Sequence, residues 1–144
     1  YYGYKITPLT EEDVSNTKSY RCILECGFMT ENWGRFTPEI IQELERANQK
    51  DLEGKTKTDA ITHWNDNIRF HLAFFELYGN QYAYQLLRSA MTLQTRAYAQ
   101  TRWAEYHSRQ FHEVPAFHGS ILEAIRQDNP ELAANLLKAD IISI

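Results

Sequence analysis

The stretch DAITHWNDNIRFHLAFFELYGN, residues 59–80, decides the fold class of this chain. Its apolar residues recur at the three- and four-residue steps of an α-helix, and Gly79-Asn80 ends the pattern with a helix C-terminal signal. These apolar positions are Ile61, Trp64, Ile68, Phe70, Phe74, Phe75 and Tyr78. The segment therefore predicts a helix whose aromatic face also carries two polar residues, Asn67 and His71.

Similar helical patterns lie on both sides of this segment. The expected helices cover residues 10–30, 37–53, 59–78, 81–107, about 111–127, and from 130 onward. Thr10 and Thr37 are predicted N-caps, Pro115 marks a kink or a late start, and Asn129 caps a helix that begins with Pro130. No segment has the pattern of a strand. The chain is predicted to be an all-α, antiparallel bundle of six or seven helices.

The first and last predicted helices also carry apolar patterns. The apolar residues expected to be buried in them are Val14, Tyr20, Ile23, Leu24 and Met29 in the first, and Leu132, Leu136, Leu137 and Ile141 in the last. We expect these residues to face the core of the bundle.

Length and composition favour one soluble domain over residues 1–144. No apolar run approaches the roughly 20 residues of a membrane span, so no membrane association is expected. The formal charge is −4 and lysine and arginine do not cluster, so this part of the protein is not expected to bind DNA itself. Tyr1 in place of a methionine allows for an upstream domain. Cys22 and Cys26 are expected to be reduced core residues, which favours a cytoplasmic protein.

Three of the predicted helices carry metal-binding residue types on their apolar faces. Asn67 and His71 stack one turn apart, His118 precedes Ile121, Leu122 and Ile125 on a core stripe, and Asp140 follows Leu136 by four. An unpaired buried polar group costs about 2–7 kcal/mol, and a shared divalent cation would satisfy several at once. The residues alone also allow ordinary buried histidines bonded to backbone carbonyls, with Asp140 in water.

Several segments together resemble one known family. They are Ile6-Thr7-Pro8-Leu9-Thr10-Glu11-Glu12-Asp13, Arg21-Cys22-Ile23-Leu24-Glu25, Phe70-His71-Leu72, Leu77-Tyr78-Gly79-Asn80 and Phe117-His118-x-x-Ile121-Leu122-x-Ala124-Ile125, followed by Asp128 and Ala133. They resemble the FCD domain, the effector-binding C-terminal domain of FadR-type regulators in the GntR family of bacterial transcription factors. The resemblance covers nearly the whole chain and implies a helical bundle with an internal ligand cavity.

The resemblance implies a divalent metal site at four positions: Asn67, His71, His118 and Asp140. Two of them depart from the family pattern, because Asn67 stands where an aspartate is expected and Asp140 where the final histidine is expected. The total charge is unchanged, and Zn, Ni, Mn or a similar ion is implied. An amide oxygen is a weak, hard ligand, so looser binding and a smaller preference for Zn or Ni are expected. Asp66 lies about 100° around the helix and is a poor substitute.

Arg21 fits the family's Arg-x-x-Leu-Glu segment, whose guanidinium often faces the cavity, where its planar fork suits a carboxylate. The alternative is a surface ion pair between Arg21 and Glu25 one turn apart. Arg96, on the long helix, is a second candidate for ligand binding. We expect at most one arginine of that helix to enter the pocket.

The resemblance therefore implies a non-enzymatic sensor domain that binds a small carboxylate effector and forms a homodimer. DNA binding would belong to a winged helix-turn-helix domain absent from this chain. Two alternatives stay open. One is a non-haem metal enzyme that uses His71, His118 and Asp140 as a two-histidine, one-carboxylate set. The other is a helical interaction module without a ligand.

Overall fold

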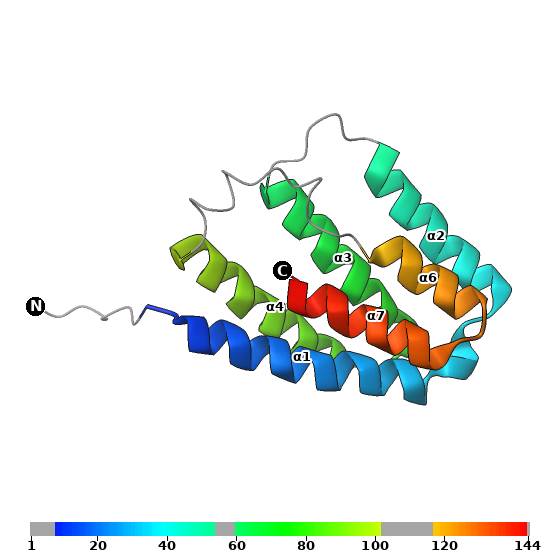
Figure 1. Ribbon diagram of the computed structural model, residues 1–144, viewed down its shortest axis with the longest axis horizontal. Helices are drawn as coiled ribbons and strands as arrows, with labels where there is room; N and C mark the ends of the chain where they lie inside the picture. The colour runs from blue at the N-terminus through cyan, green and yellow to red at the C-terminus, as the bar shows by residue number, and fades with distance from the viewer. Residues whose placement is uncertain (1–7, 54–59, 102–116, 144) are drawn as a thin grey trace, which may run out of the picture.

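The structure is a computed structural model that describes residues 8–53, 60–101 and 117–143. Within these ranges it contains α-helices and one short 3-10 helix, and no strand (Figure 1). The elements are α1 (Glu11–Glu31), η1 (Trp33–Arg35), α2 (Pro38–Glu53), α3 (Ala60–Tyr78), α4 (Gln81–Thr101), α6 (His118–Arg126) and α7 (Pro130–Ser143). The predicted all-α fold is confirmed.

The helices form a bundle in which the first and last elements lie side by side (Figure 1). Lys18 Nζ donates to the Ile142 carbonyl at 3.2 Å, and Cys26 Sγ donates to the Ala134 carbonyl at 3.5 Å. These two bonds show that α1 and α7 run antiparallel. Helix α1 also packs on α4, and α2 packs on α6 and α3. The chain therefore encloses its core between helices that are distant in sequence.

The predicted helix boundaries agree with local hydrogen bonds. Thr10 and Asp13 form a capping box, in which each residue's side chain accepts from the backbone N–H of the other. The Leu132 N–H donates to Asn129 Oδ1 at 3.1 Å, which caps the helix that begins at Pro130. Gly79 has a φ of +71°, the left-handed conformation expected after a helix end.

The start of the helix that follows Pro115 was predicted in two alternative ways. Helix α6 begins at His118, with Phe117 as its N-cap, which matches a late start after Pro115. The 3-10 turn η1 was not predicted. The predicted continuation of the long helix to residue 107 and the predicted start near residue 111 lie outside the described residues.

The buried faces of α1 and α7 differ from the predicted ones. Helix α1 buries Val14, Arg21, Glu25 and Met29, whereas Ile23 is 76% exposed and Tyr20 is 40% exposed. The prediction that Tyr20 and Ile23 face the core is therefore wrong. It failed because Arg21 and Glu25 occupy two of the four inward positions, and hydrophobic periodicity assigns charged residues to solvent.

In α7, Leu132 is 40% exposed and Leu136 is only partly buried. The buried face consists of Ala133, Leu137, Asp140 and Ile141. The prediction that Leu132 is buried is therefore wrong, although Asp140 does face inward as expected.

None of the described helices is both long enough and apolar enough to cross a membrane.

Candidate metal centre

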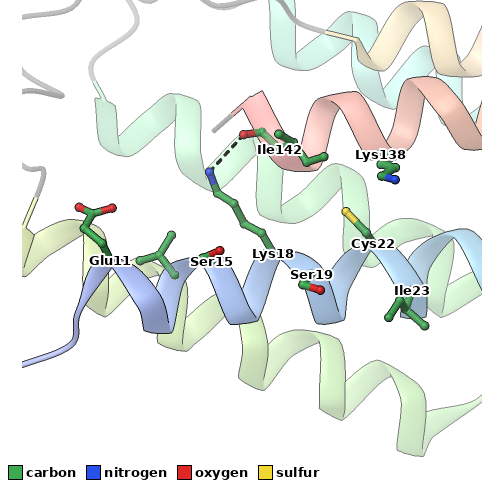
Figure 2. A pocket seen from close by; sticks show the side chains of 9 residues that line it. Glu11, Ser15, Lys18, Ser19, Cys22, Ile23, Lys138 and Ile142 are labelled. Carbon is green, nitrogen blue, oxygen red and sulfur yellow. Dashed lines mark hydrogen bonds between the residues drawn. The ribbon is translucent and has the colours of Figure 1, made fainter.

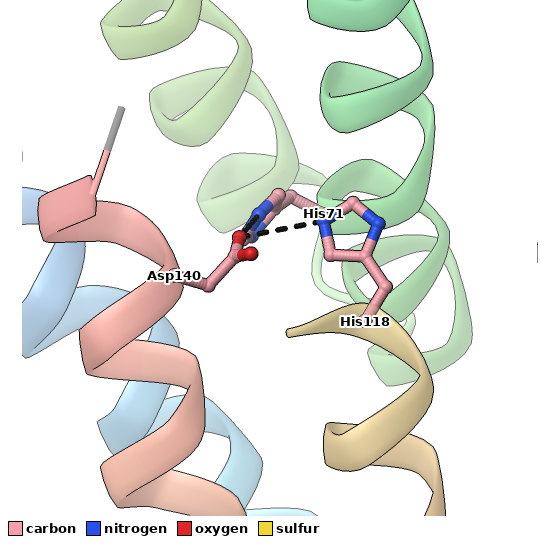
Figure 3. Close-up of side chains that lie close together, drawn as sticks. All are labelled: His71, His118 and Asp140. Atoms are coloured by element: carbon pink, nitrogen blue, oxygen red, sulfur yellow. Dashed lines mark hydrogen bonds and ion pairs between the residues drawn. The ribbon is translucent and has the colours of Figure 1, made fainter. Parts of the chain in front are cut away.

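Three side chains from three helices converge inside the bundle (Figure 3). His71 comes from α3, His118 is the first residue of α6, and Asp140 lies in the last turns of α7. One nitrogen or oxygen atom from each lies within 4.8 Å of the others. The sequence predicted this convergence from helical spacing, and the structure brings the three residues together.

His71 is completely buried between two carboxylates. Its Nδ1 donates to Glu25 Oε1 at 2.5 Å, and its Nε2 donates to Asp140 Oδ2 at 2.8 Å. The exposed fractions of the three side chains are 0% for His71, 2% for Glu25 and 1% for Asp140. Since an ionised carboxylate only accepts hydrogen bonds, both ring nitrogens carry protons in this arrangement.

His118 is held differently. Its Nε2 donates to Asn67 Oδ1 at 3.2 Å and lies 3.4 Å from Asp140 Oδ2. Its ring stacks on Phe70 with the ring centroids 3.7 Å apart and the planes inclined by 4°. Its side chain is 16% exposed. His118 therefore lies at the rim of the cluster, whereas His71 lies inside it.

Asn67 and Asp66 have separate roles, as their positions on the helix predicted. Asn67 is buried and faces His118, one turn before His71. Asp66 forms an ion pair with Arg69 on the same helix. The structure therefore brings the amide, and not the neighbouring carboxylate, to the cluster.

Arg21 extends the cluster toward α4. Its Nε donates to Glu25 Oε2 at 2.9 Å, and one terminal nitrogen donates to Gln94 Oε1 at 2.9 Å. Gln94 Nε2 in turn donates to the Tyr98 hydroxyl at 2.6 Å. The Arg21–Glu25 pair expected as a surface alternative does form, but it is buried, with exposed fractions of 1% and 2%.

The electrostatics of the cluster favour charged groups in spite of their burial. Burial alone would raise the pKa of Asp140, but hydrogen bonds from His118 and His71 and the charges of these rings hold it below its ordinary value. Burial would also raise the pKa of Glu25, but the charges of Arg21 and His71 lower it.

Burial would lower the pKa of His71, but the charge of Glu25 and the hydrogen bonds to Asp140 and Glu25 raise it. In this arrangement, a protonated His71 balances two ionised carboxylates.

The donor set fits a divalent cation. Asp140 Oδ1 is buried and has no hydrogen-bond partner among the described residues, although a buried carboxylate oxygen normally has one. His71 Nε2, His118 Nε2 and an oxygen of Asp140 are ligand types that Zn and neighbouring transition metals accept. A metal ion would take the place of the protons on His71 Nε2 and His118 Nε2, and the Asn67 amide oxygen beside His118 offers a further, weaker donor.

Arg96 is exposed on α4, two residues and therefore about 200° around the helix from the buried Gln94. The structure does not bring Arg96 to the cluster. Of the two arginines predicted to bind a ligand, Arg21 is the one whose guanidinium lies inside the bundle. One of its terminal nitrogens is buried and has no hydrogen-bond partner within the part of the chain that the structure describes.

A separate groove of about 470 Å³ lies between α1 and α7 on the surface (Figure 2). Lys18 reaches across it from α1 to the Ile142 carbonyl on α7 (Figure 2). Cys22 lines the groove, and burial raises the pKa of its thiol. Burial likewise raises the pKa of Cys26 to about 11. Both cysteines are free, as predicted, and none of the metal-centre residues lines this groove.

Sequence analysis missed three polar residues of this cluster: Glu25, Gln94 and Tyr98. For Glu25, a usable signal existed. One helical stripe, at seven- and four-residue steps, consists of Val14, Arg21, Glu25 and Met29. Because the residues at both ends of this stripe are apolar, the ion pair between them is expected on the same buried face. Gln94 and Tyr98 are also four residues apart, but a single polar pair on a long helix carries little information.

A family model described as the FCD domain matches residues 19–142. Neither the curated proteins nor the solved structures include a match to the chain.

Proposed function

We propose that this chain, which belongs to the FCD domain family, senses a small carboxylate effector at a metal ion held by His71, His118 and Asp140. Members of this family are regulatory, ligand-sensing domains of GntR-type regulators. The observation that supports this proposal most directly is the convergence of these three side chains, with one Asp140 oxygen left unpartnered. Asn67 would be a fourth, weaker ligand.

The charges in the cluster support an anionic effector. With both imidazoles neutral, Arg21 carries one positive charge against the two negative charges of Glu25 and Asp140. A divalent ion changes the net charge of the cluster from −1 to +1. The carboxylate of an effector would neutralise this positive charge. The unpartnered terminal nitrogen of Arg21 supplies a second positive contact of the kind that carboxylates prefer.

In this proposal the domain performs no covalent chemistry. The effector would bias the arrangement of two subunits, and a winged helix-turn-helix domain on the N-terminal side would bind DNA in a cytoplasmic regulator. An effector shifts such an equilibrium only by the difference between its affinities for the two arrangements. The negative net charge of the chain agrees with leaving DNA contact to another domain.

The proposal is tested by thermal melting of the metal-loaded chain with a panel of small mono- and dicarboxylates. An effector at about a hundredfold excess over its Kd stabilises the folded state by about 2.7 kcal/mol. We expect EDTA to abolish this shift, and the uncharged amides of the same acids to produce none. The absence of a shift across the panel would favour the helical interaction module without a ligand.

Arg21 and Arg96 provide a matched pair for the carboxylate contact. Arg21→Lys retains the charge but loses the planar fork, so we expect the effector affinity to fall. Arg96→Gln alters an exposed side chain and should leave that affinity unchanged. The reverse result would move the contact to Arg96.

A non-haem metal enzyme is the second candidate, because the same three residues form a two-histidine, one-carboxylate set. Membership of a regulatory domain family argues against it. Anaerobic loading with Fe(II), followed by oxygen-consumption measurements with the carboxylate panel, separates the two functions. Catalytic turnover would replace the sensor proposal.

A further inference from the structure

Glu25 contacts the nitrogen of His71 that faces away from the candidate metal position. Its Oε1 lies 2.5 Å from His71 Nδ1, and both side chains are buried. An ionised carboxylate cannot donate, so this contact requires a proton on Nδ1. When His71 is neutral, its only lone pair is therefore on Nε2, the nitrogen that faces Asp140.

Glu25 is itself fixed from the opposite side. Arg21 Nε donates to Glu25 Oε2 at 2.9 Å, so each carboxylate oxygen has its own partner. Arg21 is anchored in turn by Gln94, whose amide also bonds the Tyr98 hydroxyl. Because these side chains are buried and bonded in sequence, Glu25 has little freedom to rotate toward the metal position or away from His71.

We propose that Glu25 is a positioning residue of the metal centre, which sets the tautomer and ring orientation of His71 so that Nε2 is the metal ligand. Arg21 holds Glu25 in this role and keeps it from becoming a ligand itself. This inference rests on the proposed function. Carboxylates that accept the second N–H of a ligating histidine raise the basicity of the ligand, and their loss typically costs about 10- to 100-fold in metal affinity.

The competing explanation is purely structural: Glu25 would only neutralise the buried Arg21. Both explanations predict that a substitution destabilises the fold, so stability alone does not separate them. They differ in the state of His71. A neutralising partner has no effect on the His71 tautomer or on metal affinity once the protein is folded, whereas a positioning residue changes both.

The test uses Glu25→Gln, which retains the side-chain volume but whose amide can either donate or accept. We expect Zn²⁺ affinity, measured by competition with a chelator, to fall by about 10- to 100-fold. In ¹⁵N spectra of the Zn-loaded protein, the wild-type His71 should show a protonated Nδ1 that exchanges slowly with solvent. In the variant this proton should exchange faster. Glu25→Asp, which keeps a carboxylate, should recover part of the affinity.

Leu87→Ala is the matched control, because Leu87 is fully buried on α4 and contributes no polar atom to the cluster. It should destabilise the fold and leave Zn²⁺ affinity and the His71 spectrum unchanged.

Wild-type affinity and an unchanged Nδ1 signal in Glu25→Gln would overturn the inference. If Glu25→Gln does not fold, a Zn-loaded wild type that coordinates through His71 Nδ1 overturns it equally. If the wild type binds no Zn²⁺, the metal site of the proposed function fails, and the His71 tautomer in the metal-free protein at alkaline pH still tests the role of Glu25.

Discussion

The two histidines of the cluster are supported in opposite ways. His71 is enclosed, with a carboxylate on each ring nitrogen, whereas His118 is partly exposed, stacks on Phe70 and bonds an amide. The first arrangement fixes one ring in one orientation. The second holds its ring mainly by stacking at the first residue of a helix. The difference places His71 in the structural core and leaves His118, at the rim, as the less constrained of the two rings.

The largest expected effect comes from His71→Ala. The substitution leaves Glu25 and Asp140 buried without their shared cationic partner, and breaking such a buried pair costs about 3–5 kcal/mol. Denaturation of the metal-free protein by urea measures this loss. His118→Ala, at the rim, should cost only about 1 kcal/mol in the same experiment. Equal losses would contradict the division between an inner and a rim histidine.

His118→Ala should instead act on binding. We expect bound metal and effector affinity to fall together, with metal affinity lower by at least about 100-fold, because a direct ligand is removed. Elemental analysis of protein purified without a chelator gives the metal content. An unchanged metal content would exclude His118 as a ligand.

Asn67→Asp tests the amide that supports His118. Restoring the acid expected at this position adds a negative charge beside the metal, and we expect affinity to rise about tenfold, or about 1.4 kcal/mol. Asp66→Asn is the control, since Asp66 pairs with Arg69 and should not affect the metal. If the Asn67 variant shows no gain, Asn67 does not contact the ion.

The smallest effect is the pH dependence of the metal-free protein. Because the folded-state pKa of His71 is raised, its stabilising contribution is complete below pH 6.5 and is lost as pH rises through the folded value. The pKa values of Glu25 and Asp140 are lowered, so their contributions are lost only in acid.

Around His71 the facing charged groups are Glu25, Asp140, Arg21 and His118. We expect urea denaturation at pH 5.5 and 8 to show lower stability at pH 8, by about 1.4 kcal/mol at most for each unit of the His71 shift. Metal affinity should change in the opposite direction, because the ligands must lose protons to bind. A metal-free protein that is more stable at pH 8 would contradict the charged state of His71.

Much of the fold and part of the candidate site could be predicted from residue spacing. In α3, aromatic residues mark the buried face so strongly that Asn67 and His71 could be placed on it. In α1 the same method failed, since Arg21 and Glu25 occupy the inward face and Ile23 the outward one. A charged pair is assigned to solvent unless its partners are known, and those partners, His71 and Gln94, lie 46 and 73 residues away.

Asp140 was placed correctly from an inaccurate stripe. Leu132 and Leu136 indicated its face, yet Ala133 and Leu137 are the buried residues. Each residue turns the helix by about 100°, so Asp140 lies about 40° from Leu136 and about 20° from Ala133 when viewed down the axis. Both rows of residues therefore point to nearly the same face at Asp140. Longer apolar side chains outweighed the small alanine in the pattern, although Ala133 is completely buried.

The contacts of His71 join segments far apart in the chain: Glu25 lies 46 residues before it and Asp140 lies 69 residues after it. Contacts of this range form late in folding, after the individual helices and their hairpins have appeared. An intermediate that lacks α7 would be without the Asp140 ligand, and one that lacks α1 would be without the Glu25 carboxylate that orients His71. Ion binding would therefore report the finished chain topology, and a partly folded protein would be unable to respond to an effector.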